Sequence, residues 1–434
     1  MANAKKVNLI TLGCSKNLVD SEYLLRQLEL NGFDVQHDAD NFSKGTVIIN
    51  TCGFINDAKE ESIDTILRYA QAKEKGMING LFVMGCLSER YKSSLPDEIQ
   101  EVDAFFGVSD IATIVQKIGG RLQQEGRKQR FLTTPSHYAY LKIAEGCNRK
   151  CAFCSIPLIR GDFHSKSIEE LLEEAHYLAE NGVKELILIA QDLSSYGNDL
   201  GADVNLNKLV QELSNIEKIK WIRLHYLYPQ QFPDKLMHTI SNEPKICKYL
   251  DIPVQHINDK VLKQMRRGHN SSQTRELIAR LRENIPGLSI RTTLLTGHPG
   301  EGEEEFDELM NFVKETKFDR LGVFAYSEEE DTFGAKNYQD ILPNKIKMAR
   351  AEAIMKAQEE ISFGLNEIKV GREFTILIDR KIGNYYYGRT EHDSPEVDNE
   401  VLIPVNSTSI KPGSFVQARI TAAENYELFA EIIA

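Results

Sequence analysis

Residues 138–154, YAYLKIAEGCNRKCAFC, decide the fold of the central part of this chain. The apolar run from Ala139 to Ala144 predicts a buried strand, and Cys147, Cys151 and Cys154 follow it in a C-x3-C-x2-C pattern. A zinc ribbon would supply a second Cys or His pair nearby, and a bacterial ferredoxin run would add a fourth cysteine followed by proline. Neither is present. Three thiolates on a four-iron cluster would leave one iron open for chemistry, whereas a structural zinc site remains the alternative.

The sequence after this run alternates between strand and helix patterns. We expect strands near the following ranges: Ala139 to Ala144, Glu185 to Ala190, Trp221 to Leu224, Tyr249 to Val254, Ser289 to Leu295 and Arg320 to Phe324. Helical patterns such as SIEELLEEAHYLAENG and SSQTRELIARLREN lie between them. Six β/α repeats predict a partial, open (β/α) barrel with its active site at the carboxyl ends of the strands, where the cysteine run belongs.

The first segment, to about Gly120, also has a β/α pattern. Short apolar strands are expected at Val7 to Leu12, Val47 to Asn50 and Leu81 to Met84, with helices at Ser21 to Leu30 and Asn56 to Ala72. Such runs are typical of a parallel, doubly wound sheet. Cys14, Cys52 and Cys86 each follow one of these strands, at the edge where open α/β sheets bind ligands. The three cysteines are therefore expected to converge; the alternative is three buried, unreactive thiols.

The remaining segments predict a linker and a small third domain. Residues 120–137 are polar and weakly periodic, as a linker would be. A long helix is expected from about Pro343 to Phe363. Five short strands then predict a small antiparallel barrel of OB-like size, in the following ranges: Glu373 to Ile378, Tyr385 to Thr390, Val401 to Val405, Phe415 to Thr421 and Tyr426 to Ile432.

Composition limits the class of protein. With 434 residues, 41% hydrophobic and 27% charged, the chain suits a soluble protein of several domains. It has no apolar run long enough to span a bilayer and no convincing signal peptide, so its seven cysteines predict reduced thiols in the cytoplasm rather than disulfides. Cys247 has no partner pattern and is expected to be a small core residue. The net charge of −12 disfavours binding to a polyanion and favours a basic partner.

The cysteine motifs carry a family resemblance. The run with Phe153 before its last cysteine resembles the radical S-adenosylmethionine superfamily, in which three thiolates hold a 4Fe-4S cluster and the cofactor chelates the fourth iron. LGCSKNLVDSE, VIINTCGFI and MGCL, followed by EGCNRKCAFCSIPLIRG, resemble the methylthiotransferases. That resemblance implies an N-terminal domain with an auxiliary cluster at 5–121, a radical core at 133–364 and a TRAM domain at 367–434.

The resemblance extends to one branch of the family. GCSKNLVDSE, AQDLSSYG, DIPVQHINDKVLKQMRRG and FAYSEEEDT resemble the enzymes that modify ribosomal protein S-twelve at the β-carbon of an aspartate. Between Glu367 and Ala434, seven Lys or Arg stand against eleven Asp or Glu, and so acidic a barrel suits a basic protein better than RNA. Direct RNA binding is expected to be weak. The alternatives are a tRNA adenosine methylthiotransferase and, in another class, a non-catalytic redox sensor or RNA-binding module.

The resemblance also implies the cofactors and partners. These are two 4Fe-4S clusters, S-adenosylmethionine, a sulfur donor and an external one-electron reductant such as flavodoxin or ferredoxin. One cluster would cleave the cofactor to a 5′-deoxyadenosyl radical, and the other would carry the sulfur that becomes the methylthio group. No membrane partner is expected. Both domains would face a common substrate cavity, and the acidic third domain would hold the basic protein over it.

A few other residues are candidates for the cofactor pocket. The resemblance implies that Gln191 and Asp192 bind the cofactor amino group, with a helix cap as the alternative. Arg223 could hold the cofactor carboxylate or form an ordinary ion pair. Four residues near strand ends are expected to line the pocket: Gln255, His256, Arg291 and Gly297. Four basic residues are expected to solvate a helix: Lys260, Lys263, Arg266 and Arg267.

Overall fold

The computed structural model describes residues 5–40, 44–230, 232–405 and 409–433. The chain divides into two compact units. Unit 1 comprises Met1–Thr134, Tyr140–Arg149 and Cys154–Leu178, and unit 2 comprises Pro135–Ala139, Lys150–Phe153 and Ala179–Ala434. Within the described ranges, no helix has the length and apolar character needed to cross a membrane.

Unit 1 is built on a five-stranded parallel sheet in the order β2-β1-β3-β4-β5. The strands are β1 (Lys6–Thr11), β2 (Asp34–His37), β3 (Thr46–Thr51), β4 (Gly80–Gly85) and β5 (Ala104–Phe105). The three central strands and their parallel arrangement confirm the prediction. The edge strands β2 and β5 were not predicted, because they are short and β2 alternates between exposed and half-buried residues.

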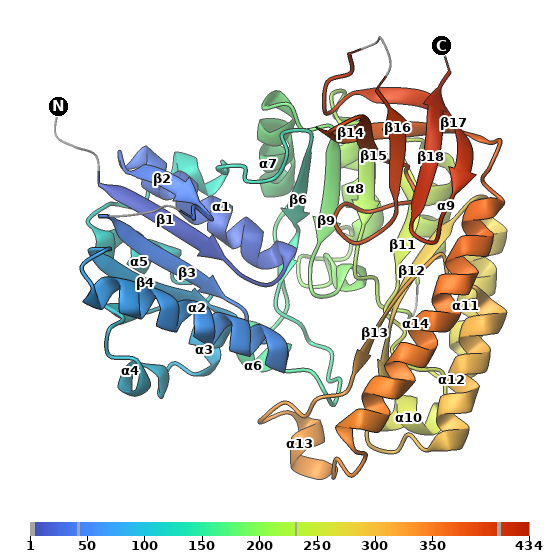
Figure 1. The fold of residues 1–434 in the computed structure, drawn as a ribbon, viewed down its shortest axis with the longest axis horizontal. Helices are drawn as coiled ribbons and strands as arrows, with labels where there is room; N and C mark the ends of the chain where they lie inside the picture. The colour runs from blue at the N-terminus through green and yellow to red at the C-terminus, as the bar shows by residue number, and fades with distance from the viewer. Residues whose placement is uncertain (1–4, 41–43, 231, 406–408, 434) are drawn as a thin grey trace. The chain divides into compact units, whose positions relative to one another are not determined.

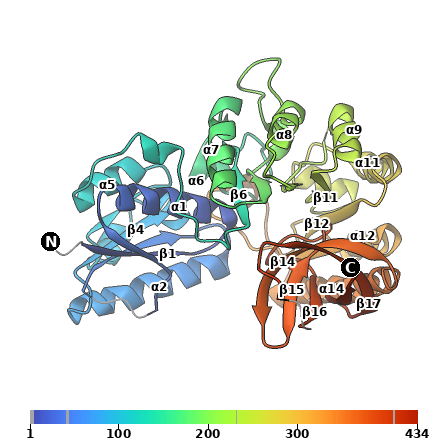
Figure 2. The same cartoon turned by 90° about the horizontal axis from the view of Figure 1, so that it is seen from above.

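Helices cover both faces of this sheet (Figure 2). Along β3, Val47 and Ile49 pack with Ile66 of α2 (Asn56–Glu74) on one face. Ile48 points to the other face, where it packs with α1 (Ser15–Leu30) and α5 (Ile111–Ile118). Alternate side chains of one strand therefore enter two different cores, as expected for a strand buried on both sides.

The polar segment before residue 134 is not a free linker, contrary to the prediction. Arg130 is fully buried, with Glu22 of α1 at 3.4 Å and Glu174 at 3.3 Å, and Thr133 donates to Glu22 at 2.8 Å. Gln27 of α1 also binds the backbone of Gln123. Side chains from distant helices hold this segment, so its local sequence gave no sign of the packing.

The central sheet has six strands in the order β13-β12-β11-β10-β9-β6 (Figure 1). They are β6 (Tyr138–Lys142), β9 (Glu185–Ile189), β10 (Trp221–Leu224), β11 (Ile246–Asp251), β12 (Ser289–Thr296) and β13 (Arg320–Ala325). The intervening helices include α7 (Ile168–Glu180), α8 (Leu206–Ser214), α9 (Asp234–Asn242), α10 (Asp259–Gln264), α11 (Ser271–Asn284) and α12 (Glu303–Thr316). The predicted six-repeat partial barrel is confirmed.

The long helix α14 (Asn344–Glu367) leads into a closed five-stranded barrel in the order β14-β15-β16-β18-β17. Its strands are β14 (Glu373–Ile382), β15 (Tyr385–Arg389), β16 (Glu400–Pro404), β17 (Phe415–Ala423) and β18 (Glu427–Ile432). Four pairings are antiparallel as predicted, but β16 and β18 are parallel. A closed ring with an odd number of strands cannot alternate direction all the way round, so one parallel pair is unavoidable.

Within unit 2, the C-terminal barrel packs against the amino ends of the central strands. Arg389 binds Glu185, the first residue of β9, at 2.8 Å, and also Asp379 at 2.7 Å. Arg320, the first residue of β13, pairs with Asp393. Trp221, the first residue of β10, packs edge-on against Phe415 with ring centroids 4.9 Å apart. The active site of such a sheet lies at its opposite, carboxyl edge.

The role of the acidic barrel in holding the substrate stays a prediction, but the structure shows what part of its acidic residues do. Five of the eleven acidic residues of the barrel region have partners on or beside the central sheet: Asp379, Glu391, Asp393, Glu396 and Asp398. Asp398, for example, accepts a hydrogen bond from Tyr249 at 2.8 Å. Part of the acidic composition therefore serves the packing of the barrel rather than a surface for a basic protein.

The interface makes a stability prediction. Arg389→Ala should lower the free energy of unfolding of unit 2 by about 3–5 kcal/mol, because it removes the buried cation that Glu185 and Asp379 share and leaves them only Arg223 and His137 as partners. Trp221 is the chain's single tryptophan and lies at the interface, so urea unfolding followed by its fluorescence measures the change. Arg419→Ala is the control, since Arg419 pairs with exposed Glu373 and its loss should leave the midpoint nearly unchanged. Equal midpoints for the two variants would contradict the prediction.

Candidate iron-sulfur sites

The upstream cysteines follow three neighbouring strands of unit 1. Cys14 lies just after β1 and Cys52 just after β3, while Cys86 begins α3 (Cys86–Arg90) directly after β4. The sheet order reverses between β1 and β3, and ligands of open α/β sheets bind at the carboxyl edge beside such a point. The three cysteines are thus brought to one edge, as predicted.

The loops that carry these cysteines are in close contact. Gly13 has φ +92°, and a Cβ there would lie 2.8 Å from the Cys52 sulfur. A Cβ on Gly53 would lie 2.7 Å from the backbone of Leu87, next to Cys86. Only glycine permits approaches this close, so glycine is needed at both positions for the three loops to meet.

Asn17 joins the loops further. Its side-chain amide donates to the backbone carbonyls of Leu12 at 2.9 Å and Thr51 at 3.0 Å, so it connects the end of β1 to the end of β3. The Ser62 hydroxyl of α2 accepts a hydrogen bond from the Cys52 backbone N–H and donates one to the Cys52 carbonyl. Asn17 is fully buried and was not singled out by sequence reasoning, although it lies in the LGCSKN motif.

The three thiols differ in exposure. Cys14 is exposed, whereas Cys52 and Cys86 are buried. Burial raises the pKa of Cys52, and it raises the pKa of Cys86 to about 11 although the nearby Arg160 cation acts in the opposite direction. A metal would deprotonate both thiols on binding, since the thiolate is the ligand. An exposed thiol beside two buried ones fits a site that is open on one side.

The downstream cysteines lie in one short loop after β6 and β7 (Ala144–Glu145). In unit 1, the Cys147 sulfur accepts a hydrogen bond from the backbone N–H of Arg149 at 3.4 Å. The loop ends at Cys154, before α6 (Ile156–Arg160). Gly146 has φ +75°, and a Cβ there would collide with the backbone of Asp162. This loop lies at the carboxyl end of the first strand of the central sheet, as expected.

Within the described residues, no three His, Cys, Asp or Glu side chains surround one metal-ion position. An iron–sulfur cluster makes a different demand, because each cysteine binds a separate iron and the thiols must be spaced around the cluster. Cys14, Cys52 and Cys86 lie on three different loops at one edge of the sheet, and such a cluster would take one thiol from each loop. The donor set of thiols alone also suits iron–sulfur chemistry better than Mg²⁺ or Ca²⁺.

Arg267 is the functional candidate that sequence reasoning placed wrongly. Its Nη1 donates to the Cys151 sulfur at 3.3 Å and its Nη2 to the Pro253 carbonyl at 2.6 Å. Its guanidinium also lies over the ring of Tyr228, 4.2 Å from the centroid. Arg267 is buried, so it does not solvate a helix as predicted, whereas Lys260 is exposed. Only tertiary contact separates these two basic residues of one motif.

The predicted cofactor residues have different surroundings. Asp192 caps the short helix η2 (Leu193–Ser195), accepting from the Ser194 backbone at 3.0 Å and the Ser195 hydroxyl at 2.7 Å. A helix cap is the alternative role that the sequence predicts for Asp192. Gln191 lies two residues after the end of β9, at the carboxyl edge of the sheet. Phe153 packs beside Val261, Met265, Leu295 and Tyr326 and against His298.

The predicted carboxylate-binding role of Arg223 is not supported by its position. The guanidinium is fully buried, donates to Glu185 at 2.9 Å and to the Glu391 carbonyl at 2.7 Å, and so faces the amino ends of the strands. Arg291 likewise lies toward the C-terminal barrel, 3.8 Å from Asp398. Strand alternation indicated which residues point inward, but not toward which end of the strands a long side chain extends.

His256, which is predicted to line the pocket, and Cys247, which is predicted to be a core residue, are both buried. His256 is fully buried and lies 3.2 Å from Glu301, which pairs with Arg350 at 2.7 Å, so the histidine is part of a structural polar chain. Cys247 is 1% exposed among apolar side chains, and burial raises the pKa of its thiol to about 12. The prediction that Cys247 is a core residue is confirmed.

Fold and sequence together define the class of protein. Residues 141–313 match the Radical SAM superfamily, residues 6–107 match the Uncharacterized protein family UPF0004, and residues 370–433 match the TRAM domain. A radical S-adenosylmethionine domain of this class uses an iron–sulfur cluster and S-adenosylmethionine. With full-length relatives at about half identity, the chain belongs to the ribosomal protein uS12 methylthiotransferase family.

The similarity to these relatives extends over the whole chain. The protein of Phocaeicola vulgatus, named ribosomal protein uS12 methylthiotransferase RimO, is 50% identical over 427 residues, covering 98% of this chain and 99% of the relative. The protein of the same name from Flavobacterium johnsoniae is 51% identical, covering 98% of each. Among solved structures, the radical S-adenosylmethionine methyltransferase TsrM from Kitasatospora setae, with cobalamin and a 4Fe-4S cluster bound, shares the fold. Its TM-score is 0.54 at 13% identity, over 76% of this chain and 74% of that one.

Proposed function

We propose that this protein adds a methylthio group to the β-carbon of an aspartate in ribosomal protein uS12. The observation that carries the proposal is the pair of cysteine triplets, one following three strands of the N-terminal sheet and one in the loop after β7. A single triplet would suffice to cleave S-adenosylmethionine, whereas sulfur insertion needs a second reactive centre. The full-length relatives are named for ribosomal protein uS12, which favours uS12 as the substrate.

Each triplet would hold one 4Fe-4S cluster, giving two in total. Cys147, Cys151 and Cys154 would bind the first, and Cys14, Cys52 and Cys86 the auxiliary one. When bound, the first cluster supplies an electron that cleaves S-adenosylmethionine, and the second offers an open iron for the sulfur to be transferred. The domains that carry these roles are 5–121, 133–364 and the TRAM domain at 367–434.

The chain's own residues would position these groups. Arg267 restrains the Cys151 side chain through its contact with the sulfur. Gln191 and Asp192, at the carboxyl edge beside β9, are candidates to bind the cofactor ammonium, and Phe153 to pack beside the cofactor. Residues such as Leu295 and Tyr326 form an apolar surface next to Phe153, which would exclude water from a reactive intermediate.

The experiment uses anaerobically reconstituted protein with purified uS12, S-adenosylmethionine, a sulfide source and dithionite as reductant. We expect mass spectrometry to find a methylthio increment on a single aspartate-containing peptide of uS12, and about eight irons per chain. Unmodified uS12 together with methylthiolated tRNA adenosine would favour the tRNA enzyme instead. Flavodoxin or ferredoxin in place of dithionite would then test the physiological electron donor.

A further inference from the structure

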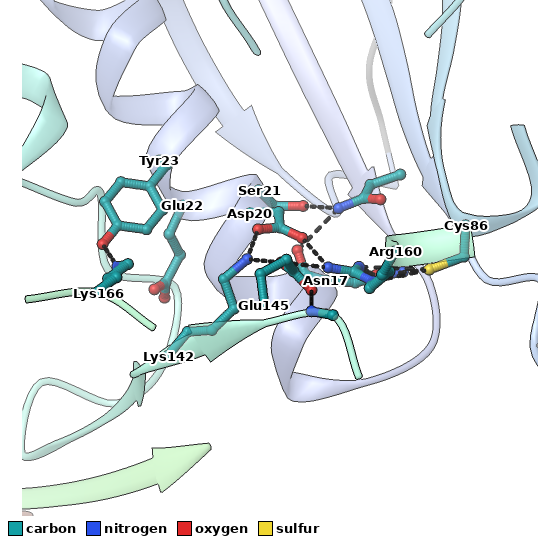
Figure 3. A network of polar contacts seen from close by, with 12 residues as sticks. Asn17, Asp20, Ser21, Glu22, Tyr23, Cys86, Lys142, Glu145, Arg160 and Lys166 are labelled. Atoms are coloured by element: carbon teal, nitrogen blue, oxygen red, sulfur yellow. Dashed lines mark hydrogen bonds and ion pairs between the residues drawn. The ribbon is translucent and has the colours of Figure 1, made fainter. Parts of the chain in front are cut away.

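Arg160 makes a set of contacts that the proposed reaction does not explain. It is the last residue of α6, six positions after Cys154, and its side chain is 2% exposed. Its Nε and Nη2 each lie 3.4 Å from the sulfur of Cys86, which belongs to the other triplet (Figure 3). An arginine from the motif of one cysteine set thus touches a cysteine of the second.

The guanidinium uses its full donor capacity. Besides the two contacts with Cys86, Nη1 donates to Asp20 at 3.1 Å and Glu145 at 2.8 Å, and Nη2 donates to Asn17 at 2.6 Å. A guanidinium has five N–H groups, one on Nε and two on each Nη, so every donor has an acceptor. This planar fork is a geometry that lysine cannot reproduce. The orientation of Arg160 toward the sulfur is therefore set by its carboxylate and amide partners.

The charges around Arg160 balance without the sulfur. Lys142 pairs with both Asp20 and Glu145, so two cations face two carboxylates (Figure 3). An arginine guanidinium stays protonated in proteins, and here Asp20 and Glu145 both accept hydrogen bonds from it. Arg160 is thus a permanent donor. A negative sulfur at Cys86 would therefore add one negative charge beyond those of the two carboxylates, next to the Arg160 cation.

We propose that Arg160 is a positioning residue for the auxiliary cluster, orienting the Cys86 sulfur and raising the reduction potential of the cluster through two hydrogen bonds to it. The inference rests on the proposed function, since it takes Cys14, Cys52 and Cys86 as cluster ligands. Hydrogen bonds to cluster sulfurs tune the potential, and outer partners of metal ligands fix their orientation. A donor beside the thiolate stabilises the reduced form more, because that form carries one more negative charge.

The test isolates the auxiliary cluster. In the full-length chain, Cys147, Cys151 and Cys154 are replaced by alanine, and the protein is reconstituted with iron and sulfide and titrated with dithionite while electron paramagnetic resonance follows the cluster. Arg160→Gln should change the ratio of reduced to oxidised cluster at a fixed potential about tenfold toward the oxidised form, which is ~59 mV for one electron. Arg160→Lys keeps the charge but loses the fork, and should give a smaller shift.

The matched control is Arg130→Gln in the same background. Arg130 is also a fully buried arginine of unit 1 that lies beside two carboxylates, and among the described residues its ion-pair partners are Glu22 and Glu174 rather than a cysteine. It should leave the potential unchanged. Loss of iron from both Arg160 variants, with iron retained by Arg130→Gln, would also support a positioning role for Arg160.

Two results would overturn the inference in distinguishable ways. In the first, the background protein holds about four irons, but Arg160→Gln leaves the reduction potential unchanged or Arg130→Gln shifts it equally. Either result would refute the role of Arg160 alone. No iron in the background protein would refute the assignment of Cys14, Cys52 and Cys86, and with it both this inference and the two-cluster part of the proposed function.

Discussion

Replacing Cys151 by alanine should reduce the cleavage of S-adenosylmethionine to the level of a dithionite control without protein. Cys151 is one of three thiols expected to bind the first cluster, and its sulfur already accepts a hydrogen bond from Arg267. With two thiolates left, the cluster would lack one of its three protein ligands, so electron transfer to the sulfonium would have no defined geometry. The measurement is 5′-deoxyadenosine formed by reconstituted protein, quantified by liquid chromatography.

Cys247→Ala is the matched control for this result. Cys247 is buried among Trp221, Tyr249 and Leu377, away from either cysteine motif in the sequence, and its replacement should preserve cleavage. Cleavage by Cys151→Ala at the unmodified rate would show that the C-x3-C-x2-C run does not hold the active cluster. If the unmodified protein itself produced no 5′-deoxyadenosine, a non-catalytic redox sensor would become the better description of the chain.

Replacing Cys52 by alanine should separate the two halves of the reaction. The variant should still cleave S-adenosylmethionine, because Cys147, Cys151 and Cys154 are intact, but methylthio transfer to uS12 should fall below detection. Cys52 is buried between Gly13 and the hydroxyl of Ser62, so no other thiol can take its place without moving the loop. The paired measurements are 5′-deoxyadenosine and the methylthio increment on the uS12 peptide, with iron content falling to about four per chain.

Cys52→Ser makes a useful companion variant. Serine keeps the size of the side chain, whereas its hydroxyl is a poor iron ligand beside a thiolate. Loss of transfer in both variants would attribute the effect to the sulfur rather than to packing against Gly13. Normal methylthio transfer by either variant would show that the upstream triplet does not carry the sulfur.

The cysteines were predictable because they lie next to strong local signals. Cys14, Cys52 and Cys86 each follow a buried apolar strand, and parallel strands of one sheet end at the same edge. The strands themselves could be located because runs such as Val47 to Asn50 are apolar on both faces. The edge strand β2 gave no such signal, since its residues, Asp34 to His37, alternate between exposed and half-buried.

Long cationic side chains were the least predictable feature. For Arg223 the sequence leaves the cofactor carboxylate and an ion pair as alternatives, and the structure shows an ion pair with Glu185, while Arg267, expected in solvent, contacts Cys151. An arginine side chain spans enough distance to reach either end of its strand or a neighbouring loop. Its partner is therefore chosen by carboxylates and sulfurs that lie far away in the sequence.

The amino-acid sequence by itself determined the β/α repeats, the small C-terminal barrel and the position of both cysteine triplets, because hydrophobic periodicity and motif spacing are local properties of the chain. Tertiary structure decided how the buried charges pair. It placed Arg160 between Asp20 and Cys86. It also brought Asp393 and Asp398 of the C-terminal barrel into contact with Arg320 and Tyr249 of the central strands. A buried charge needs a partner of opposite sign or a hydrogen bond, and only the folded chain brings those partners within reach.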